Sequence, residues 1–531
     1  MIDKVELVLG LLAAVTCIAL LGRKLPIPYP ILLVLGGLLL SLIPGLPPVR
    51  VRPEIVFLVF LPPMLYPAAL FMPWRDFHAN LRPISLLAIG LVLFTTLLVG
   101  LIAHRLIPDL PLAAGFVLGA IVSPPDAIAA IAITERLRVP RRIVTVLEGE
   151  SLVNDATALV AYRFALAATL TGSVALGSLA ARFVLVALGG ILIGLIVGFL
   201  TTWIQRKIDD PPIEISLSLV TPFAAYLPAE QLGLSGVLAV VTTGLYHGWR
   251  LPEITSSSTR LQAGPVWEMI EFLLNGFIFI LIGLQLPEVL SALSGYSTTE
   301  LIWYGGGISL AVILIRIIWV FPASYLPRLL SEKLRQRDPY PSWQHVAIVA
   351  WTGLRGMVSL AAALAIPLSG ANHAPFPGRE LILFLTFSVI LATLVVQGLT
   401  LPMLIRWLGV KDDGSIEREE CLARLKANEA ALARLEEIAK SEPGKDGVLE
   451  RLREEYRDRI RQLETADVGD GERRGGLFSN EYDRLAHEAL RVERATLLRL
   501  RNERVINDET LRRIQHDIDL AEARLSRPRS H

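Results

Sequence analysis

Apolar residues gather into long blocks along roughly the first 410 residues of this 531-residue chain. Most blocks approach about 20 residues, the length at which an α-helix crosses the hydrocarbon core of a bilayer. The alternation typical of membrane β-strands is absent, which disfavours a β-barrel. We therefore predict an all-α polytopic membrane protein with about 13 transmembrane helices, at 5–22, 27–44, 54–72, 84–103, 112–133, 147–171, 178–205, 213–228, 233–247, 266–286, 301–326, 343–368 and 380–409.

Basic residues alternate from loop to loop along these spans. Lys and Arg collect on the cytoplasmic side of short loops. Sixteen basic residues follow odd-numbered spans, and four follow even-numbered spans. We expect a multi-pass protein of the cell (plasma or inner) membrane with its N-terminus outside and its C-terminal tail in the cytoplasm. The first set is Arg23, Lys24, Arg75, Arg82, Arg136, Arg138, Arg141, Arg142, Arg206, Lys207, Arg250, Arg260, Arg328, Lys333, Arg335 and Arg337, and the second is Arg50, Arg52, Arg105 and Arg379.

The overall charge changes the picture only when it is sorted along the chain. The net charge of +1 balances 51 basic against 50 acidic residues, and more than half of these residues follow position 410. Together with the 53% of hydrophobic residues and only two cysteines, this distribution excludes a soluble enzyme, a nucleic-acid binder and a disulfide scaffold. The start, Met1 to Lys4, lacks a basic region before the apolar block, so we expect a retained span rather than a signal peptide.

The chain after residue 410 has a different character. Residues 416–440 and 447–465 combine helical spacing with dense mixed charge, residues 467–476 resemble a glycine-rich linker, and residues 480–526 resume a helical pattern. We expect a membrane domain at 1–410 and a charged helical C-terminal domain at 411–531. A short bundle or coiled coil that serves dimer contact or regulation is the favoured interpretation, and a merely solvated tail is the alternative.

A helix break is predicted in the fifth span. Ser123, Pro124, Pro125 and Asp126 follow one another there, and two consecutive prolines remove two backbone donors. Freed carbonyl groups at this depth are tolerated only where they face protein or a wet cavity. A carboxylate beside such carbonyls offers hard oxygen ligands to a small cation. A simple proline kink with a structural aspartate is the alternative.

The sixth span carries a second set of polar residues. Glu150 and Asn154 are four residues apart, as are Ser151 and Asp155, so each pair shares one side of a helix. Asp155 lies near the middle of the hydrocarbon region, about 12 Å from the inner start of its span. A desolvated carboxylate there can hold either a proton or a metal cation, and exclusive occupancy by one of the two is the minimal chemistry of an exchanger. A polar helix-packing patch is the alternative.

Arginines inside two later spans point to partners for these acids. Arg316, in the eleventh span, needs a buried anion, and Glu150 is the best candidate for this structural ion pair unless Arg316 snorkels to the interface. Arg355 lies between Gly353 and Gly356 in the twelfth span, where we predict a second break with Arg355 opposing freed carbonyls, or else a packing notch. Broken spans five and twelve are seven apart, which suggests inverted repeats around a midplane site. Arg163 is a further ionisable residue within a span.

The segment 149–155, Gly-Glu-Ser-Leu-Val-Asn-Asp, closely resembles the motif of the cation:proton antiporter-1 family, the NhaP-like and eukaryotic sodium/proton exchangers. The resemblance covers roughly residues 5–410, because the 123–127 stretch, the Arg316 segment and the 353–356 stretch fall in the family's order and spans. It implies a core domain with two crossed discontinuous helices, here spans five and twelve. It also implies a dimerisation domain, and hence a homodimer whose core moves elevator-fashion.

The same resemblance implies roles for individual residues. Asp155 is similar to the family's ion-binding and proton-carrying carboxylate, and Asn154 to the residue typical of electroneutral members. Ser151 and Asp126 resemble further ligands of the transported Na⁺, and Glu150 resembles the acid that pairs with the arginine of the eleventh helix. No cofactor is implied.

Two departures from the family pattern concern ion choice. The fifth span has Pro125-Asp126-Ala127 where Thr-Asp-Pro is common, and the third span has Pro67 where an acid is frequent. We expect exchange of Na⁺, or of Li⁺, for H⁺, and because these departures leave the choice of cation open we keep K⁺/H⁺ exchange as the alternative. An intramembrane aspartyl protease built on Asp126 and Asp155 and a cation channel are the rivals from other classes.

Overall fold

The computed structural model describes residues 2–22, 29–43, 56–126, 137–171, 176–291, 295–368, 375–410, 414–441 and 446–467, with scattered positions elsewhere. Ala127, most of the predicted 467–476 linker and most of the 480–526 helix lie outside the described residues. The chain divides into two compact units, Met1–Lys411 and Asp412–His531, each of which is described by itself.

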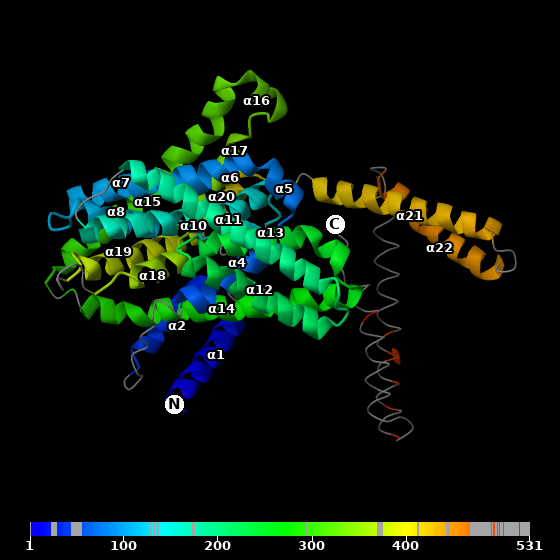
Figure 1. The fold of residues 1–531 in the computed structure, drawn as a ribbon, viewed down its shortest axis with the longest axis horizontal. Coiled ribbons are helices and arrows are strands. Elements are labelled where there is room, and N and C mark those ends of the chain that lie inside the picture. The colour runs from blue at the N-terminus through cyan, green and yellow to red at the C-terminus, as the bar shows by residue number, and fades with distance from the viewer. Residues whose placement is uncertain are drawn as a thin grey trace. The chain divides into compact units, whose positions relative to one another are not determined.

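The first unit is a bundle of helices (Figure 1), and many of its large apolar side chains are exposed. Its elements are α1 (Ile2–Gly22), α2 (Tyr29–Ser41), η1 (Val56–Phe60), α4 (Leu61–Leu70), α5 (Trp74–Ala79), α6 (Leu81–Ser85), η2 (Leu86–Leu91), α7 (Val92–Leu106), α8 (Leu112–Val122), α10 (Arg141–Thr171), α11 (Leu176–Gln205), α12 (Pro211–Gln231), α13 (Gly236–Ile254), α14 (Ser257–Ser291), α15 (Thr298–Leu330), α16 (Glu332–Arg337), α17 (Trp343–Trp351), α18 (Met357–Leu364), α19 (Arg379–Ala392), η4 (Thr393–Gln397) and α20 (Gly398–Leu408). The η elements are π-helical segments continuous with α-helix.

Every predicted apolar block overlaps described helix. Among the residues that the structure describes, five helices are long and apolar enough to cross a membrane, namely Leu81–Leu106, Arg182–Gln205, Ser258–Ser291, Thr298–Leu330 and Arg379–Leu408. Shorter apolar helices lie at Val8–Gly22, Tyr29–Ser41, Phe57–Leu70 and Leu112–Val122. The all-helical prediction is therefore confirmed for the described residues, whereas the count of 13 crossings and the inverted repeats stay predictions.

Local sequence fixes several helix starts. Ser297 caps α15 in a complete capping box, because its hydroxyl accepts from the Glu300 N–H and Glu300 accepts from the Ser297 N–H. Asp210 caps α12, whose first positions are prolines that need no partner for a missing N–H. These caps leave the long apolar stretches behind them free to form uninterrupted helices.

Small residues allow α2 and α14 to pack closely. A Cβ atom on Gly37 would overlap the Ile280 carbonyl, and one on Gly283 would overlap the Val34 carbonyl. Backbones that approach this closely exclude any larger side chain, as at many helix contacts in membranes. This contact ties the N-terminal helices to α14.

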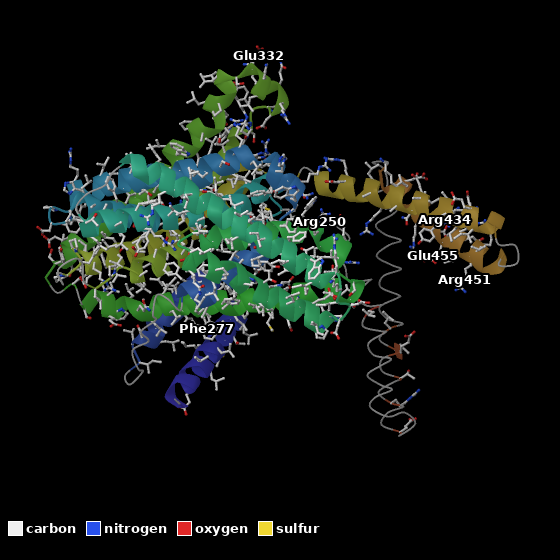
Figure 2. All side chains as sticks on the ribbon, viewed as in Figure 1. Arg250, Phe277, Glu332, Arg434, Arg451 and Glu455 are labelled. Atoms are coloured by element: carbon white, nitrogen blue, oxygen red, sulfur yellow. The ribbon has the colours of Figure 1, made fainter. Side chains whose placement is uncertain are left out.

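The second unit contains a charged helical hairpin. Helices α21 (Ser415–Ser441) and α22 (Asp446–Asp467) pack on each other, and the apolar side chain of Leu449 is buried. Figure 2 shows their charged side chains, with Arg434, Arg451 and Glu455 labelled. The surface ion pair of Arg434 with Glu437 spans 2.6 Å, and Arg453 and Arg457 hold the pKa of Glu450 below its ordinary value. Both predicted helices, 416–440 and 447–465, fall on this hairpin.

Candidate functional site

Two helix interruptions meet inside the first unit. Helix α8 ends at Val122, and residues Ser123 to Asp126 are not helical. Pro124 and Pro125 cannot donate backbone hydrogen bonds, which accounts for the end of α8. A second interruption, 352–356, separates α17 from α18 and contains two glycines. Both breaks occur where the sequence predicts them.

The two non-helical segments cross in direct contact. The Asp126 N–H donates a 2.7 Å hydrogen bond to the Leu354 carbonyl. A Cβ atom on Gly356 would overlap the carboxylate of Asp126, so this approach requires glycine at that position. Asp126 and Leu354 are 228 positions apart in the sequence, yet a backbone hydrogen bond joins their two segments.

Arg355 satisfies the carbonyls that these breaks release. Its Nε donates to the Val122 carbonyl at 2.9 Å and its Nη2 to the Ser123 carbonyl at 3.4 Å, while Nη1 donates to the Gly353 carbonyl. The residue is 1% exposed, and its positive charge lies at the C-terminal end of α8, where the helix dipole is negative. Its own backbone N–H donates to Thr393 Oγ1 at 3.1 Å. One side chain thus stabilises both breaks.

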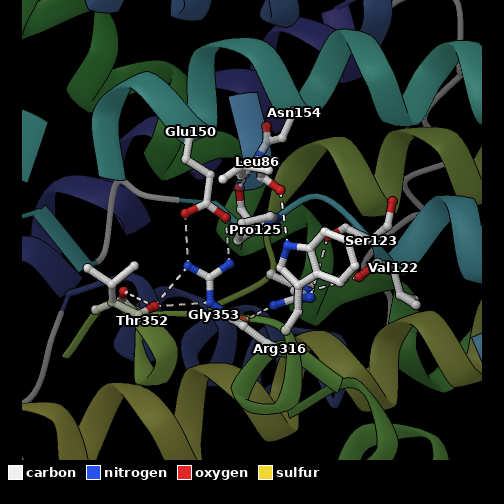
Figure 3. A network of polar contacts seen from close by, with 12 residues as sticks. Leu86, Val122, Ser123, Pro125, Glu150, Asn154, Arg316, Thr352 and Gly353 are labelled. Carbon is white, nitrogen blue, oxygen red and sulfur yellow. Dashed lines mark hydrogen bonds and ion pairs between the residues drawn. The ribbon is translucent and has the colours of Figure 1, made fainter. Parts of the chain in front are cut away.

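A buried ion pair braces α10 beside the crossing (Figure 3). Arg316 Nη1 and Nη2 donate to the two carboxylate oxygens of Glu150 at 2.5 and 2.9 Å, and both side chains are 1% exposed. Nε and Nη2 of Arg316 also donate to the Val349 carbonyl, at 3.2 and 3.0 Å, and Thr352 Oγ1 donates to the same oxygen. The pair therefore links α10, α15 and α17 through the end of the broken helix.

The next turn of α10 presents the polar residues that face the crossing. Asn154 Nδ2 donates to the Pro125 carbonyl at 3.0 Å, while its buried Oδ1 lacks a hydrogen-bond partner. Asp155 is buried and lies near enough to Asp126 for electrostatic interaction. In the part of the chain that the structure describes, no hydrogen bond reaches the Asp155 carboxylate. Ser151 and Asp126 are half-buried.

Oxygen-bearing side chains on α10 and in the first break lie beside the crossing. The side chains of Asp155, Asp126 and Ser151, with Oδ1 of Asn154, are hard ligands of the kind that alkali cations prefer. Among the described residues, no group of three or more His, Cys, Asp and Glu side chains suits a resident metal ion. Carboxylate oxygens in general can bind a small cation when ionised and hold a proton when neutral.

The structure gathers nearly all of the predicted residues in one place. Ser123, Pro124, Pro125, Asp126, Asn154, Gly353, Arg355 and Gly356 form or contact the crossing, and Glu150 and Arg316 pair beside it. Arg163 behaves differently from a buried functional charge, because its side chain is 45% exposed and pairs with Glu230 at 2.6 Å.

Some residues at this site carry no signal in the sequence. Thr393 is one threonine in a long apolar block, and Val349 contributes only its carbonyl. Thr352 adjoins the predicted break, but its bond to the Val349 carbonyl depends on the local backbone path. Only the folded chain identifies these contacts.

Comparison with known proteins places the chain in a family. The family model described as "Sodium/hydrogen exchanger, transmembrane" matches residues 11–407. The chain is 37% identical to "Uncharacterized Na(+)/H(+) exchanger Rv2287" of Mycobacterium tuberculosis over 98% of this chain and 96% of that protein. It is 36% identical to the "Sodium, potassium, lithium and rubidium/H(+) antiporter" of Bacillus pumilus over 75% of this chain and 60% of that protein.

A solved structure supports the fold independently. The sodium proton antiporter MjNhaP1 from Methanocaldococcus jannaschii superimposes with a TM-score of 0.60 and 23% identity, covering 76% of this chain and 98% of that one. At this identity the match concerns the architecture alone.

Proposed function

Because the chain belongs to the sodium/hydrogen exchanger family, we propose that it exchanges Na⁺ for H⁺ across the membrane by competition at Asp155. Members of this family are multi-pass membrane proteins and secondary transporters rather than enzymes. Residues 1–410 would form the antiporter domain, with 13 spans in inverted repeats and the N-terminus outside. Residues 411–531 would form a cytoplasmic domain.

The observation that carries this proposal is the crossing of two non-helical segments beside a buried carboxylate. Non-helical backbone at membrane depth occurs where it lines protein or a wet site, and discontinuous helices at a repeat interface are typical of midplane ion sites. Here the Asp126 N–H donates to the Leu354 carbonyl, and Asp155 lies on α10, the helix that packs against the crossing. Arg355 donates to carbonyls of the two breaks and Arg316 pairs with Glu150, and among the described contacts neither arginine bonds Asp155, which supports Asp155 as the group that binds the cargo.

The exchange step follows from the ligand set. In the ionised form, Asp155 would bind Na⁺ together with Asp126, Ser151 and Oδ1 of Asn154. In the protonated form, the same carboxyl would release the cation. A bare carboxylate is costly to move through an apolar region, so only the loaded core would cross. We propose an elevator motion of the core against a homodimer scaffold, with one cation exchanged for one proton.

The test is proton flux in reconstituted vesicles with Na⁺, Li⁺ and K⁺ supplied in turn, at clamped membrane potential. We expect Na⁺-driven flux in the parent chain and its loss in Asp155→Asn, which keeps the side chain's shape but removes the titrating charge. Asp209→Asn is the matched control, because Asp209 is an exposed carboxylate distant in sequence from the site. Cation-dependent flux that persists in Asp155→Asn would contradict the proposal.

Potassium/proton exchange is the second candidate. The relative from Bacillus pumilus carries potassium in its printed name alongside sodium, lithium and rubidium. Pro67 and the Pro125-Asp126-Ala127 stretch also replace residues that are common in the family. Flux driven by K⁺ as effectively as by Na⁺ in the same vesicles would favour this alternative.

A further inference from the structure

A cavity of about 110 Å³ lies where α6, η2, α10, α15 and α17 meet. Its floor is apolar and includes Leu86, Leu87, Ile143, Val146 and Val346. Its rim carries three arginines, Arg82, Arg142 and Arg328, from three different elements. A space of this size exceeds what one water molecule needs, and can accept a phosphate-sized group.

The three arginines share a single carboxylate. Arg328 Nη2 donates to Asp338 Oδ2 at 2.6 Å and Nε to its backbone carbonyl at 3.1 Å. Arg142 Nη2 donates to Asp338 Oδ1 at 2.7 Å. Each carboxylate oxygen of Asp338 already accepts one hydrogen bond from a neighbouring arginine, and Arg82 Nη1 lies 3.7 Å from Oδ2, beyond hydrogen-bond distance.

Arg82 is the unsatisfied member of this cluster. Both of its terminal nitrogens are buried and have no hydrogen-bond partner, although the side chain as a whole is 30% exposed. Arg328 is 5% exposed at the side chain, so the positive charge is partly desolvated as well as concentrated. Buried guanidinium donors without an acceptor are costly, and the cost falls when an anion supplies oxygens.

The combination of charge and apolar surface indicates the ligand. The side chains of the proposed ion site, Asp126, Ser151 and Asp155, do not line the cavity, and three arginines suit an anion rather than a cation. Arg82, Arg142 and Arg328 all belong to the basic set that the loop pattern places on the cytoplasmic side. Basic pockets between helices on that side bind anionic lipid headgroups.

We propose that this cavity binds the phosphate of an anionic phospholipid from the cytoplasmic leaflet. Arg82 and its two neighbours would hold the phosphate oxygens, and the apolar floor would contact the glycerol and acyl part. The membrane side rests on the orientation proposed above, but the site needs no step of the exchange reaction. Val349 lines the same cavity and accepts from Arg316, so an occupied site adjoins the ion pair that braces α10.

The test measures lipid-dependent stabilisation of the delipidated full chain in detergent, by tryptophan fluorescence on heating. Phosphatidylglycerol, phosphatidylethanolamine and inorganic phosphate are added in separate titrations. We expect stabilisation by phosphatidylglycerol only, and about fivefold more lipid for half-saturation in Arg82→Gln, since one interfacial basic residue contributes that factor. Arg206→Gln is the matched control, because Arg206 has the same charge, belongs to the same basic set and lies outside the cavity.

Each outcome decides the matter. Equal responses of Arg82→Gln and Arg206→Gln, or equal stabilisation by the two lipids, would overturn the site. Equal stabilisation by inorganic phosphate alone would show that the cavity binds free phosphate, and would overturn the phospholipid as the ligand. Ala323→Leu, which fills the cavity while keeping all three arginines, should weaken the lipid response too, and it serves as the test if Arg82→Gln fails to fold. Because the readout is binding, failure here leaves the exchange proposal standing.

Discussion

Removal of one partner from the Glu150–Arg316 ion pair should destabilise the protein strongly. The change is Glu150→Leu, which replaces the carboxylate with an apolar side chain of related size. Arg316 then loses both hydrogen bonds to the carboxylate, at 2.5 and 2.9 Å, and keeps only those to the Val349 carbonyl. Its charge stays buried without an anion, since the side chain is 1% exposed.

The size of the effect follows from this burial. Breaking a buried ion pair by deleting one partner costs about 3–5 kcal/mol, because an uncompensated charge remains. Replacing both partners with apolar residues is often near neutral. We therefore expect Glu150→Leu to lower the free energy of unfolding by about 3–5 kcal/mol, and Glu150→Leu/Arg316→Met to recover much of that loss.

The assay is reversible unfolding of the purified protein in mixed micelles, followed by tryptophan fluorescence. Arg163→Met is the matched control, since Arg163 pairs with Glu230 at a similar distance but is 45% exposed. That control should cost no more than about 1 kcal/mol. Equal effects of Glu150→Leu and Arg163→Met would refute the reasoning, as would a double variant no more stable than Glu150→Leu. Unchanged stability with lost cation binding would instead make Glu150 a ligand.

Three further predictions concern the crossing, the topology and the competition. Gly356→Ala should displace the Asp126 carboxylate and lower the exchange rate by on the order of 100-fold. The size-exclusion profile of the variant should match that of the parent chain, which shows that the fold is intact. In a chain without native cysteines, Glu332→Cys should react with an impermeant maleimide only in inside-out vesicles and Asp109→Cys only in right-side-out ones; the reverse pattern would overturn the orientation. Apparent KM for Na⁺ should rise by about tenfold per unit fall in pH where one proton competes with one cation, and a pH-independent KM would contradict competition at Asp155.

Much of this fold is predictable from the sequence because membrane burial imposes a simple length rule. The apolar blocks overlap the helices, and the break at Pro124 and Pro125 lies where two backbone donors are missing. The partnership of Glu150 with Arg316 is also predictable, since each would be costly alone. These features depend on local composition or on a scarcity of alternative partners.

Other features depend on contacts between distant positions. Tyr66 and His247 form a 2.5 Å hydrogen bond across 181 positions, and neither residue belongs to a recognisable pattern. The π-helical segments η1, η2 and η4 change the helix phase without a proline at their centre. Arg163 lies within an apolar block, but its side chain is not buried, because it pairs with Glu230 and is partly exposed to the surroundings. Sequence position within an apolar block does not determine depth or partner.

The charged side chains around the crossing determine how the proposed exchange would respond to the membrane potential. Glu150, Asp126 and Asp155 supply three negative charges, and Arg316 and Arg355 supply two positive ones. With all five groups ionised these residues sum to one negative charge, which under the proposed exchange a single proton or a single alkali cation would cancel. The transmembrane field does about 2.3 kcal/mol of work per charge per 100 mV, and it does none on a neutral body. Under the proposed one-for-one exchange, either cargo would cross at a rate indifferent to voltage, and the concentration gradients alone would set the direction of exchange.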